Sequence, residues 1–184
     1  VPASYRDRPE RSAYLVEILR RHAAPEARLL EIGCNVGRNL HHLHEAGYRT
    51  LTGIEISEDA IAALRAAFPD SAARADLHVG AAEDVLPTMA EGSFDLVFTM
   101  AVLEHIHPSS EWLFDDIRRI CAGHLITIED ERSRSWRHYP RDYGALFTAR
   151  GFEELWTEQV PAETGLPSGF RARVVRITSP RAAG

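Results

Sequence analysis

The sequence predicts an α/β protein in which a mainly parallel β-sheet is covered by helices on both faces. Short apolar runs alternate with segments whose apolar residues recur at helical spacing, from residue 12 to residue 178. The run at 94–99, Phe-Asp-Leu-Val-Phe-Thr, is nearly all apolar, which is typical of a buried parallel strand. The first apolar run, at 28–32, leads into a glycine turn and then a helix.

Length and composition favour one domain across residues 1–184, since 45% of the residues are hydrophobic. The net charge of −6 argues against a nucleic-acid or anionic-membrane partner. No apolar run approaches the roughly 20 residues of a membrane span, and the first residues lack the apolar core of a signal peptide. Cys34 and Cys121 have no metal-like spacing, so we expect reduced thiols in a cytoplasmic protein.

The first part of the chain is predicted to hold two helices around one strand. A leading helix is expected at 12–22, with Ser12 as its N-cap and Pro25 as its stop. The strand at 28–32 enters the glycine turn. The helix after the turn is expected to end at Gly47, a residue suited to a left-handed C-terminal cap.

The glycine turn itself, Gly-Cys-Asn-Val-Gly, is predicted to hold a nucleotide-like ligand. Gly33 and Gly37 allow positive φ and let a ligand approach without meeting a Cβ. The helix that follows directs its free N–H groups towards that ligand. Asn35 stands near the middle glycine of the usual fingerprint, and asparagine tolerates the left-handed conformation well.

The second strand, at 50–56, ends in an acidic residue. Glu55 lies 22 positions after Gly33 (55 − 33) and can accept hydrogen bonds from both hydroxyls of a ribose. Ser57 is expected to cap the next helix, which Pro69 closes.

The remaining elements follow from the same patterns. We expect strands at 77–80, 94–99, 124–128, 153–160 and 171–178, and helices at 111–120 and 141–149. The last two strands have no helix between them, so one should be antiparallel. Ligands of such sheets bind beyond the carboxyl ends of the strands, where the polar clusters of this chain fall.

Four segments, in this order and spacing, resemble class I S-adenosylmethionine-dependent methyltransferases with a methyltransferase type 11/12-like domain. They are Glu-Ile-Gly-Cys-Asn-Val-Gly at 31–37, Glu55, Gly-Ala-Ala-Glu-Asp-Val at 80–85, and Phe-Asp-Leu-Val-Phe-Thr-Met-Ala-Val-Leu-Glu-His-Ile at 94–106. The resemblance covers about residues 12–130. It implies a Rossmann-like seven-stranded sheet of order 3-2-1-4-5-7-6 with strand 7 antiparallel. It also implies S-adenosyl-L-methionine as cofactor and S-adenosylhomocysteine as product.

The same resemblance implies which residues hold the cofactor. They are Glu31, Gly33, Cys34, Asn35 and Gly37 for the methionine part, Glu55 and Ile56 for the ribose and adenine edge, Ala82, Glu83 and Asp84 for the adenine, and the Met100 carbonyl for the sulfonium end. Where the family often has an aspartate after Gly80, this chain has Ala81. Glu83 or a backbone carbonyl is the expected substitute.

Methyl transfer requires a nucleophile about 3 to 3.5 Å from the methyl carbon and, where needed, a base that removes its proton. The candidate catalytic residues are His105, His107 and Glu129, and the candidate substrate contacts are Glu104, Glu131, Trp136, His138 and Tyr143. Each has a structural alternative. His105 could pack beneath its loop, the acidic residues at 129–131 could be charges at a strand end, and Arg141 with Asp142 could form a cap and an ion pair.

No metal site is predicted. His41, His42 and His44 cluster on the helix after the turn without metal-ligand partners elsewhere, so we interpret them as an exposed helix face. Tyr14 either packs in the core or closes over the cofactor.

The leading functional hypothesis is an enzyme that moves a methyl group to N or O of a small molecule or a peptide residue. Few residues are left for a substrate domain, so we expect a compact acceptor or a site completed by a partner protein or a homodimer. One alternative is an inactive cofactor-binding partner subunit or regulatory module. The other is a nicotinamide-dependent oxidoreductase, which predicts a Tyr-x-x-x-Lys or similar hydride site, and the chain has no lysine.

Overall fold

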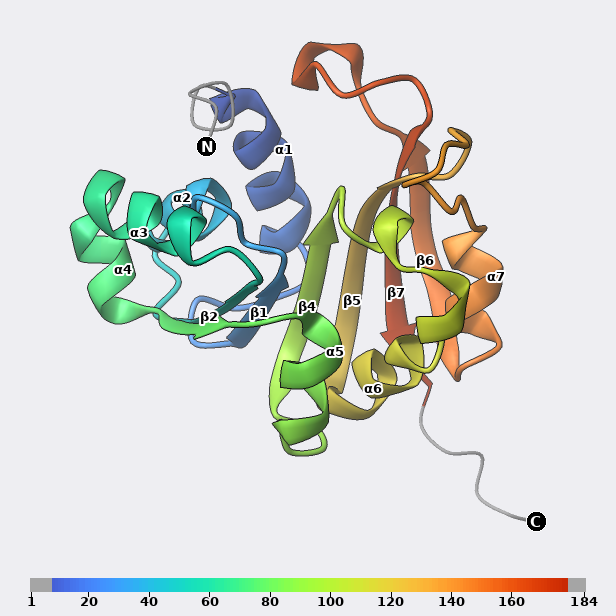
Figure 1. The fold of residues 1–184 in the computed structure, drawn as a ribbon, viewed down its shortest axis with the longest axis horizontal. Helices are drawn as coiled ribbons and strands as arrows, with labels where there is room; N and C mark the ends of the chain where they lie inside the picture. Colours follow the sequence, from blue (N-terminus) through green and yellow to red (C-terminus); the bar gives the residue numbers. More distant parts are fainter. Residues whose placement is uncertain (1–7, 179–184) are drawn as a thin grey trace.

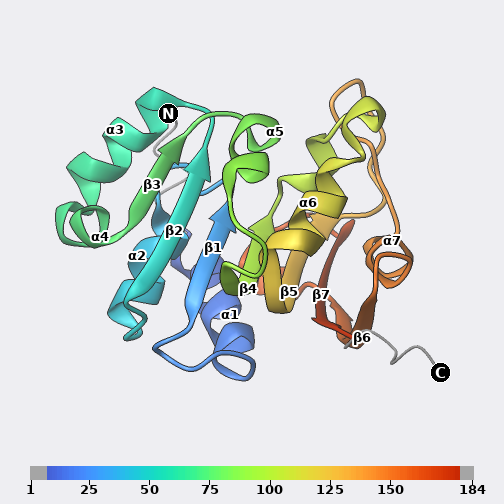
Figure 2. The ribbon, with the colours of Figure 1, turned by 90° about the horizontal axis from the view of Figure 1, so that it is seen from below.

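The structure, a computed structural model, describes residues 8–178. The first seven residues, which bear on the signal-peptide expectation, lie outside this range. Seven strands form one sheet of order β3-β2-β1-β4-β5-β7-β6, seen side by side in Figure 2. The strands are β1 (Arg28–Ile32), β2 (Thr50–Glu55), β3 (Asp76–Val79), β4 (Phe94–Met100), β5 (Cys121–Asp130), β6 (Phe152–Gln159) and β7 (Phe170–Ile177).

The strand directions confirm the predicted fold class. Strands β1 to β5 pair in parallel, whereas β7 is antiparallel to both β5 and β6. In Figure 1 the β4 arrow accordingly points up and the β7 arrow points down. This is the order and the single reversed strand that the family resemblance implied.

Helices cover both faces of the sheet (Figures 1 and 2). They are α1 (Pro9–Arg20), α2 (Arg38–Glu45), α3 (Glu58–Ala67), α4 (Pro69–Arg74), α5 (Ala82–Val85), α6 (Leu113–Ile120) and α7 (Tyr143–Thr148), with short 3-10 helices η2 (Leu86–Thr88), η3 (Leu103–His105), η4 (Pro108–Ser110) and η5 (Ala162–Thr164). Among residues 8–178, no helix has the length and apolar content of a membrane span.

Each strand of the sheet centre contributes to two hydrophobic cores. Leu29 packs with α1, α2 and α3 on one face, and the next residue, Leu30, packs with α6 and α7 on the other. Side chains alternate between the faces of a strand, so a strand buried on both sides must be apolar at successive positions. This is why the segments predicted as strands do not alternate between apolar and polar residues.

Several predicted boundaries were wrong. Helix α1 begins at Pro9, so Ser12 lies inside the helix, is buried, and donates its hydroxyl to Asn39 Oδ1 at 2.7 Å instead of capping. Pro69 closes α3 but also opens α4, because proline is well tolerated in a first helical turn. Strand β5 begins at Cys121, three residues before the predicted start at 124. Helices α6 and α7 each begin two residues later than predicted.

Two predicted helix ends are confirmed. Gly47 has φ of 103°, and the following Tyr48 N–H donates to Leu43 O at 3.0 Å. Ser57 caps α3, since its hydroxyl oxygen accepts from the Ala60 N–H at 3.2 Å. Cys34 and Cys121 are free and buried.

The parallel strands end together at one edge of the sheet. Ile32 of β1 pairs with Ile54 of β2 and with Thr99 of β4, and Met100 pairs with Ile128 of β5. The chain runs outwards from β1 to β3 in one direction and from β4 to β5 in the other. The connections therefore diverge between β1 and β4, which is where such sheets open a crevice.

Candidate active site

A cleft of about 700 Å³ opens at this edge, within the usual range for small-molecule sites. Its walls come from the segments after β1, β2, β3 and β4. They are joined by residues of α1, of the β5–α7 loop and of the β6–β7 loop. The lining residues are Arg11, Glu31, Ile32, Gly33, Cys34, Asn35, Val36, Arg38, Asn39, Ile54, Glu55, Ile56, Gly80, Ala81, Ala82, Glu83, Met100, Ala101, Val102, Glu104, His105, Ile106, His138 and Leu166.

The turn after β1 is fixed by the neighbouring strand and by its own side chains. The N–H groups of Gly33 and Cys34 both donate to Ile54 O, at 2.8 and 2.9 Å. Asn35 has φ of 48°, which confirms the predicted left-handed conformation, and its Oδ1 accepts from the Val36 N–H at 2.8 Å. A Cβ at Gly33 would lie 2.4 Å from Val102 Cγ2, so any side chain there would clash with the loop after β4.

Gly37 does not line the cleft, contrary to its predicted role. It has φ of 72° and precedes α2 as its N-cap. A Cβ there would lie 2.3 Å from Leu64 of α3. Helix packing and backbone conformation each favour glycine at this position.

Glu31 is a buried carboxylate at the floor of the cleft. Only 2% of the residue is exposed, and Oε1 accepts from Asn39 Nδ2 at 2.7 Å. Within residues 8–178, Oε2 has no hydrogen-bond partner. Burial raises the pKa of Glu31 to about 8, although the Asn39 hydrogen bond and the nearby Arg38 charge oppose that rise. A cationic group bound at this oxygen would favour the charged carboxylate and lower that pKa.

Glu55 is held at the cleft rim by backbone amides. Its Oε2 accepts from the Asn35 N–H and its Oε1 from the Ser57 N–H, both at 2.9 Å. Each carboxylate oxygen has a further lone pair available for a ligand. The adjacent Ile56 is 70% exposed and lines the same rim.

The cofactor residues predicted after β3 and β4 also reach the cleft, with one exception. Ala82, Glu83 and Met100 line it, whereas Asp84 is exposed and does not. Cys34 lines the cleft as a buried thiol, and burial raises its pKa and so disfavours the thiolate.

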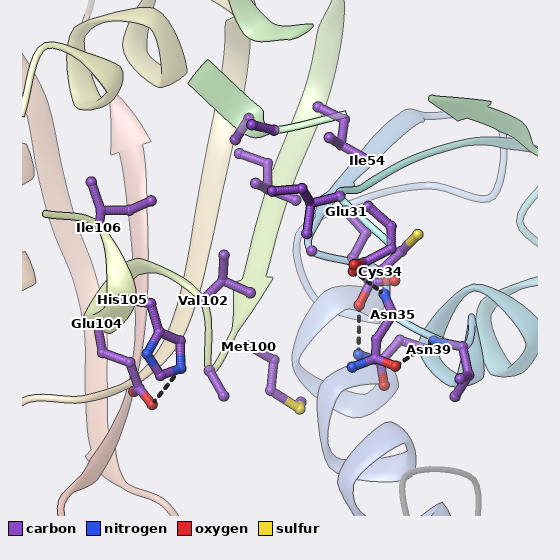
Figure 3. Close-up of a pocket in the computed structure, with 18 of the residues that line it drawn as sticks. Glu31, Cys34, Asn35, Asn39, Ile54, Met100, Val102, Glu104, His105 and Ile106 are labelled. Carbon is purple, nitrogen blue, oxygen red and sulfur yellow. Dashed lines mark hydrogen bonds and ion pairs between the residues drawn. The ribbon is translucent and has the colours of Figure 1, made fainter. Parts of the chain in front are cut away.

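A second polar group, Glu104, His105 and His138, lies across the cleft from Glu31. Figure 3 shows Glu104 and His105 on one side and Glu31, Asn35 and Asn39 on the other, with Met100 and Val102 between them. His138 arrives from the β5–α7 loop. Its ring centroid lies 4.9 Å from that of His105.

Glu129, a predicted catalytic residue, makes structural contacts. The carboxylate is fully buried and does not line the cleft. Its Oε2 accepts from the N–H groups of Val102 and Glu104, at 2.9 and 3.4 Å. Burial raises the pKa of Glu129 to about 8, and repulsion from Glu104 adds to the rise. Glu129 thereby holds the loop after β4 in place.

Four other predicted catalytic or substrate residues also lie outside the cleft lining. His107 caps η4 through Ser109, and Glu131 forms ion pairs with Arg173 and Arg171. Trp136 is 77% exposed beneath the Arg137 guanidinium, and Tyr143 is fully buried in the core. Of the eight predictions of this kind, Glu104, His105 and His138 are the ones that line the cleft.

The structural alternatives hold for Arg141 and Asp142. Asp142 caps α7 by accepting from the Ala145 N–H at 3.0 Å, and Arg141 pairs with Glu111. Tyr14 donates its hydroxyl to Glu158 at 2.7 Å while packing against the core.

The histidines of α2 do not form an exposed face as predicted. His41 and His44 each place Nδ1 3.1 Å from Ser71 Oγ of α4. His41 also stacks on Phe68, with ring centroids 4.2 Å apart. These side chains join α2 to the α3–α4 segment.

The lining residues that were not predicted as site residues include Arg11, Arg38, Asn39 and Leu166. Asn39 was detectable as a polar residue two positions beyond the glycine turn. Leu166 carried no signal, because it reaches the cleft only through the β6–β7 loop. Arg11 of α1 holds this loop by donating to the carbonyls of Thr164 and Gly165, at 3.0 and 2.8 Å.

Comparison with known proteins identifies relatives of this chain. A family model described as "Methyltransferase domain" matches residues 30–124. Among curated proteins, a ubiquinone biosynthesis O-methyltransferase from Aromatoleum aromaticum is 37% identical over 115 residues, covering 55% of this chain and 48% of the relative. The chain thus spans about half the length of that relative.

Solved structures share the fold. A SAM-dependent methyltransferase from Methanosarcina mazei superposes with a TM-score of 0.72 at 18% identity, covering 87% of this chain and 96% of that one. The magnesium protoporphyrin IX methyltransferase from Synechocystis, solved with bound SAH, gives a TM-score of 0.71 at 16% identity, covering 97% and 88%.

The raised pKa of Glu31 predicts a pH-dependent cost to stability. Between about pH 4.5 and pH 8 the folded chain keeps a proton that the unfolded chain loses, so this residue lowers the free energy of unfolding as pH rises. Glu31→Gln removes that dependence. Urea denaturation gives the free energy of unfolding of both chains. The difference in this free energy should grow by roughly 2 to 4 kcal/mol in favour of the variant as the pH rises from 5 to 8. An equal difference at both pH values would contradict the assigned pKa.

The two amides held by Glu129 predict a loss of stability on its removal. Glu129→Ala should lower the free energy of unfolding by about 2 kcal/mol, because two loop N–H groups lose their acceptor. Glu91→Ala, at an exposed position, serves as the control and should stay within about 0.5 kcal/mol of the native chain. Equal stability of the two variants would refute the structural role of Glu129.

Proposed function

The chain belongs to the methyltransferase domain family, whose model matches just over half of it, and from this membership we propose that it is an S-adenosylmethionine-dependent methyltransferase acting on a small molecule. The cofactor binds across the cleft between β1 and β4. The observation that carries the proposal is the buried Glu31 Oε2, which has no hydrogen-bond partner within the described range.

The environment of Glu31 fits the amino-acid end of this cofactor. A buried carboxylate oxygen without a donor is costly, and an ammonium group supplies both a hydrogen bond and the compensating charge. A pyrophosphate group at this place would instead be repelled by the buried Glu31 carboxylate. The turn at Gly33 and Asn35 lies beside Glu31 and receives the rest of the methionine part. This end of the cleft favours an amino-acid cofactor over a dinucleotide.

The opposite end of the cofactor is assigned to the rim formed by Glu55. Its two oxygens, fixed by backbone amides, are oriented to accept from the two ribose hydroxyls. The exposed Ile56 side chain offers an apolar surface to the adenine, with Ala82 and Glu83 on the far wall. Ala81 provides no carboxylate, so the backbone and Glu83 are left to bind the adenine amine.

When bound, S-adenosylmethionine supplies a methyl group activated by a positively charged sulfur. Met100 lies between the two polar groups of the cleft (Figure 3), so the reacting centre is assigned to this position. The acceptor then lies beside Glu104, His105 and His138. These side chains bind its hydroxyl or amine and orient it, while Ile106 and Leu166 offer apolar contacts.

The acceptor atom is a nitrogen or an oxygen. One curated relative is named as an O-methyltransferase and another, from Streptomyces fradiae and 35% identical over 66 residues, as an N,N-dimethyltransferase. The three polar side chains on the acceptor side suit a hydroxyl or an amine. A small molecule fits a cleft of about 700 Å³ that α1 and the β6–β7 loop border.

Methyl transfer is tested by incubating the chain with methyl-labelled cofactor and a panel of phenols, sugars and amines, with detection by mass spectrometry. Label should appear on at least one hydroxyl or amine acceptor and depend on the chain. S-adenosylhomocysteine binding without transfer to any panel member would favour the inactive partner subunit. Absence of both binding and transfer would refute the proposal.

The ribose assignment predicts weaker cofactor binding when the Glu55 charge is removed. Glu55→Gln should raise the dissociation constant of S-adenosylhomocysteine by roughly 5- to 100-fold, since charged hydrogen bonds contribute about 1 to 3 kcal/mol. Isothermal titration calorimetry measures the change. Glu58→Gln, three residues on and exposed, is the matched control and should bind as the native chain does. Unchanged affinity of Glu55→Gln would refute the assignment.

A further inference from the structure

Three metal-ligating side chains from two separate segments meet on the acceptor side of the cleft. Glu104 and His105 belong to η3, whereas His138 lies 33 residues further on (138 − 105) in the β5–α7 loop. One ligand atom from each of the three lies within 4.8 Å of the other two. We propose that these residues bind a divalent transition-metal ion, an inference that rests on the proposed function of the cleft.

The distances suit a shared cation better than direct hydrogen bonds. Glu104 Oε1 lies 3.7 Å from His105 Nε2 and 3.9 Å from His138 Nε2. Both distances exceed the usual hydrogen-bond range. Donors about 2.1 Å from a tetrahedral metal lie roughly 3.4 Å from one another. The Glu104–His105 and Glu104–His138 distances exceed that value by about 0.3 and 0.5 Å, and the two histidine ligand atoms lie within 4.8 Å of each other.

Hydrogen bonding at the other ring nitrogens supports the same assignment. His105 Nδ1 lies 2.9 Å from the Arg137 carbonyl oxygen, which can only accept, so Nδ1 carries a proton. In the neutral ring, Nε2 is then an acceptor that faces a carboxylate oxygen 3.7 Å away, and a cation between the two acceptors would bind both. His138 Nδ1 is likewise held by Ser135 Oγ at 2.9 Å. Such anchoring of the second nitrogen is usual for metal-bound histidines.

Glu104 is fixed so that one oxygen remains for the cation. The residue is 4% exposed, and its Oε2 accepts from the Asp130 N–H at 2.5 Å. The Tyr139 N–H donates to the Glu104 carbonyl at 2.7 Å, which ties the loop carrying His138 to η3. The site is thus assembled by backbone contacts as well as by its ligands.

Two imidazoles and one carboxylate select a class of metal. This set suits Zn²⁺, Fe²⁺ and Co²⁺ rather than Mg²⁺ or Ca²⁺, which prefer oxygen ligands. The expectation of no metal site was based on the α2 histidines, whereas this cluster is assembled only by the fold.

A metal with three protein ligands keeps at least one position open to the cleft. An acceptor hydroxyl that binds there releases its proton to solvent more readily, because the cation stabilises the oxyanion. The oxygen then forms a bond to the methyl carbon, and the sulfur keeps the electron pair of the broken carbon–sulfur bond. The metal therefore favours an acceptor with a hydroxyl group.

The test is calorimetric titration of the metal-free full chain with Zn²⁺, in parallel with S-adenosylhomocysteine. The native chain should bind one Zn²⁺. Affinity for Zn²⁺ should fall at least 10-fold in His105→Ala and in His138→Ala. Affinity for Zn²⁺ should be unchanged in His107→Ala. His107 lies two residues after His105 but does not line the cleft.

S-adenosylhomocysteine separates this proposal from the proposed function, since its binding reports on the other side of the cleft. Binding of it without Zn²⁺, or equal Zn²⁺ affinity in all variants, would overturn the metal site and leave the cofactor site intact. Binding of neither ligand would overturn both. Circular dichroism and S-adenosylhomocysteine affinity show whether His105→Ala and His138→Ala remain folded.

Discussion

A carboxylate buried at the end of a central strand needs a positively charged partner, and the cleft is built around that need. Glu31 has lost its hydration, and one of its oxygens is bound by Asn39. Asn39 is in turn bound by Ser12 of α1, so the first helix of the fold positions the carboxylate. Burial of an unpaired charge costs several kcal/mol, a cost that a cationic ligand offsets on binding.

The contrast with Glu129 separates a ligand site from a structural one. Both carboxylates are buried at the carboxyl edge of the sheet, and both have a pKa raised to about 8. Glu129 accepts from two backbone N–H groups and thereby shapes the loop after β4. Glu31 faces the cleft with one oxygen that no described residue binds. Burial and a shifted pKa alone do not distinguish the two roles; the hydrogen-bond partners do.

Most of the fold and one half of the site could be predicted from the sequence. The apolar runs predicted the strands. Glu55 could be placed at the cleft rim because it ends β2, and the carboxyl ends of parallel strands lie at one edge of the sheet. The left-handed conformation of Asn35 could be predicted because asparagine tolerates positive φ. The acceptor side was harder to predict. Trp136 and His138 lie in the β5–α7 loop and Tyr143 begins α7. They are exposed, in the cleft and in the core respectively, because the path of that loop depends on contacts such as that of Tyr139 with Glu104.

The most direct test is a crystal structure of the chain with S-adenosylhomocysteine. We expect the ligand ammonium within hydrogen-bond distance of Glu31 Oε2 and both ribose hydroxyls on Glu55, with the sulfur near Met100. The same structure would show the thioether facing Glu104 and His105 across the cleft. An ammonium bound elsewhere, with Glu31 Oε2 still lacking a partner, would contradict the central claim that this carboxylate defines the ligand.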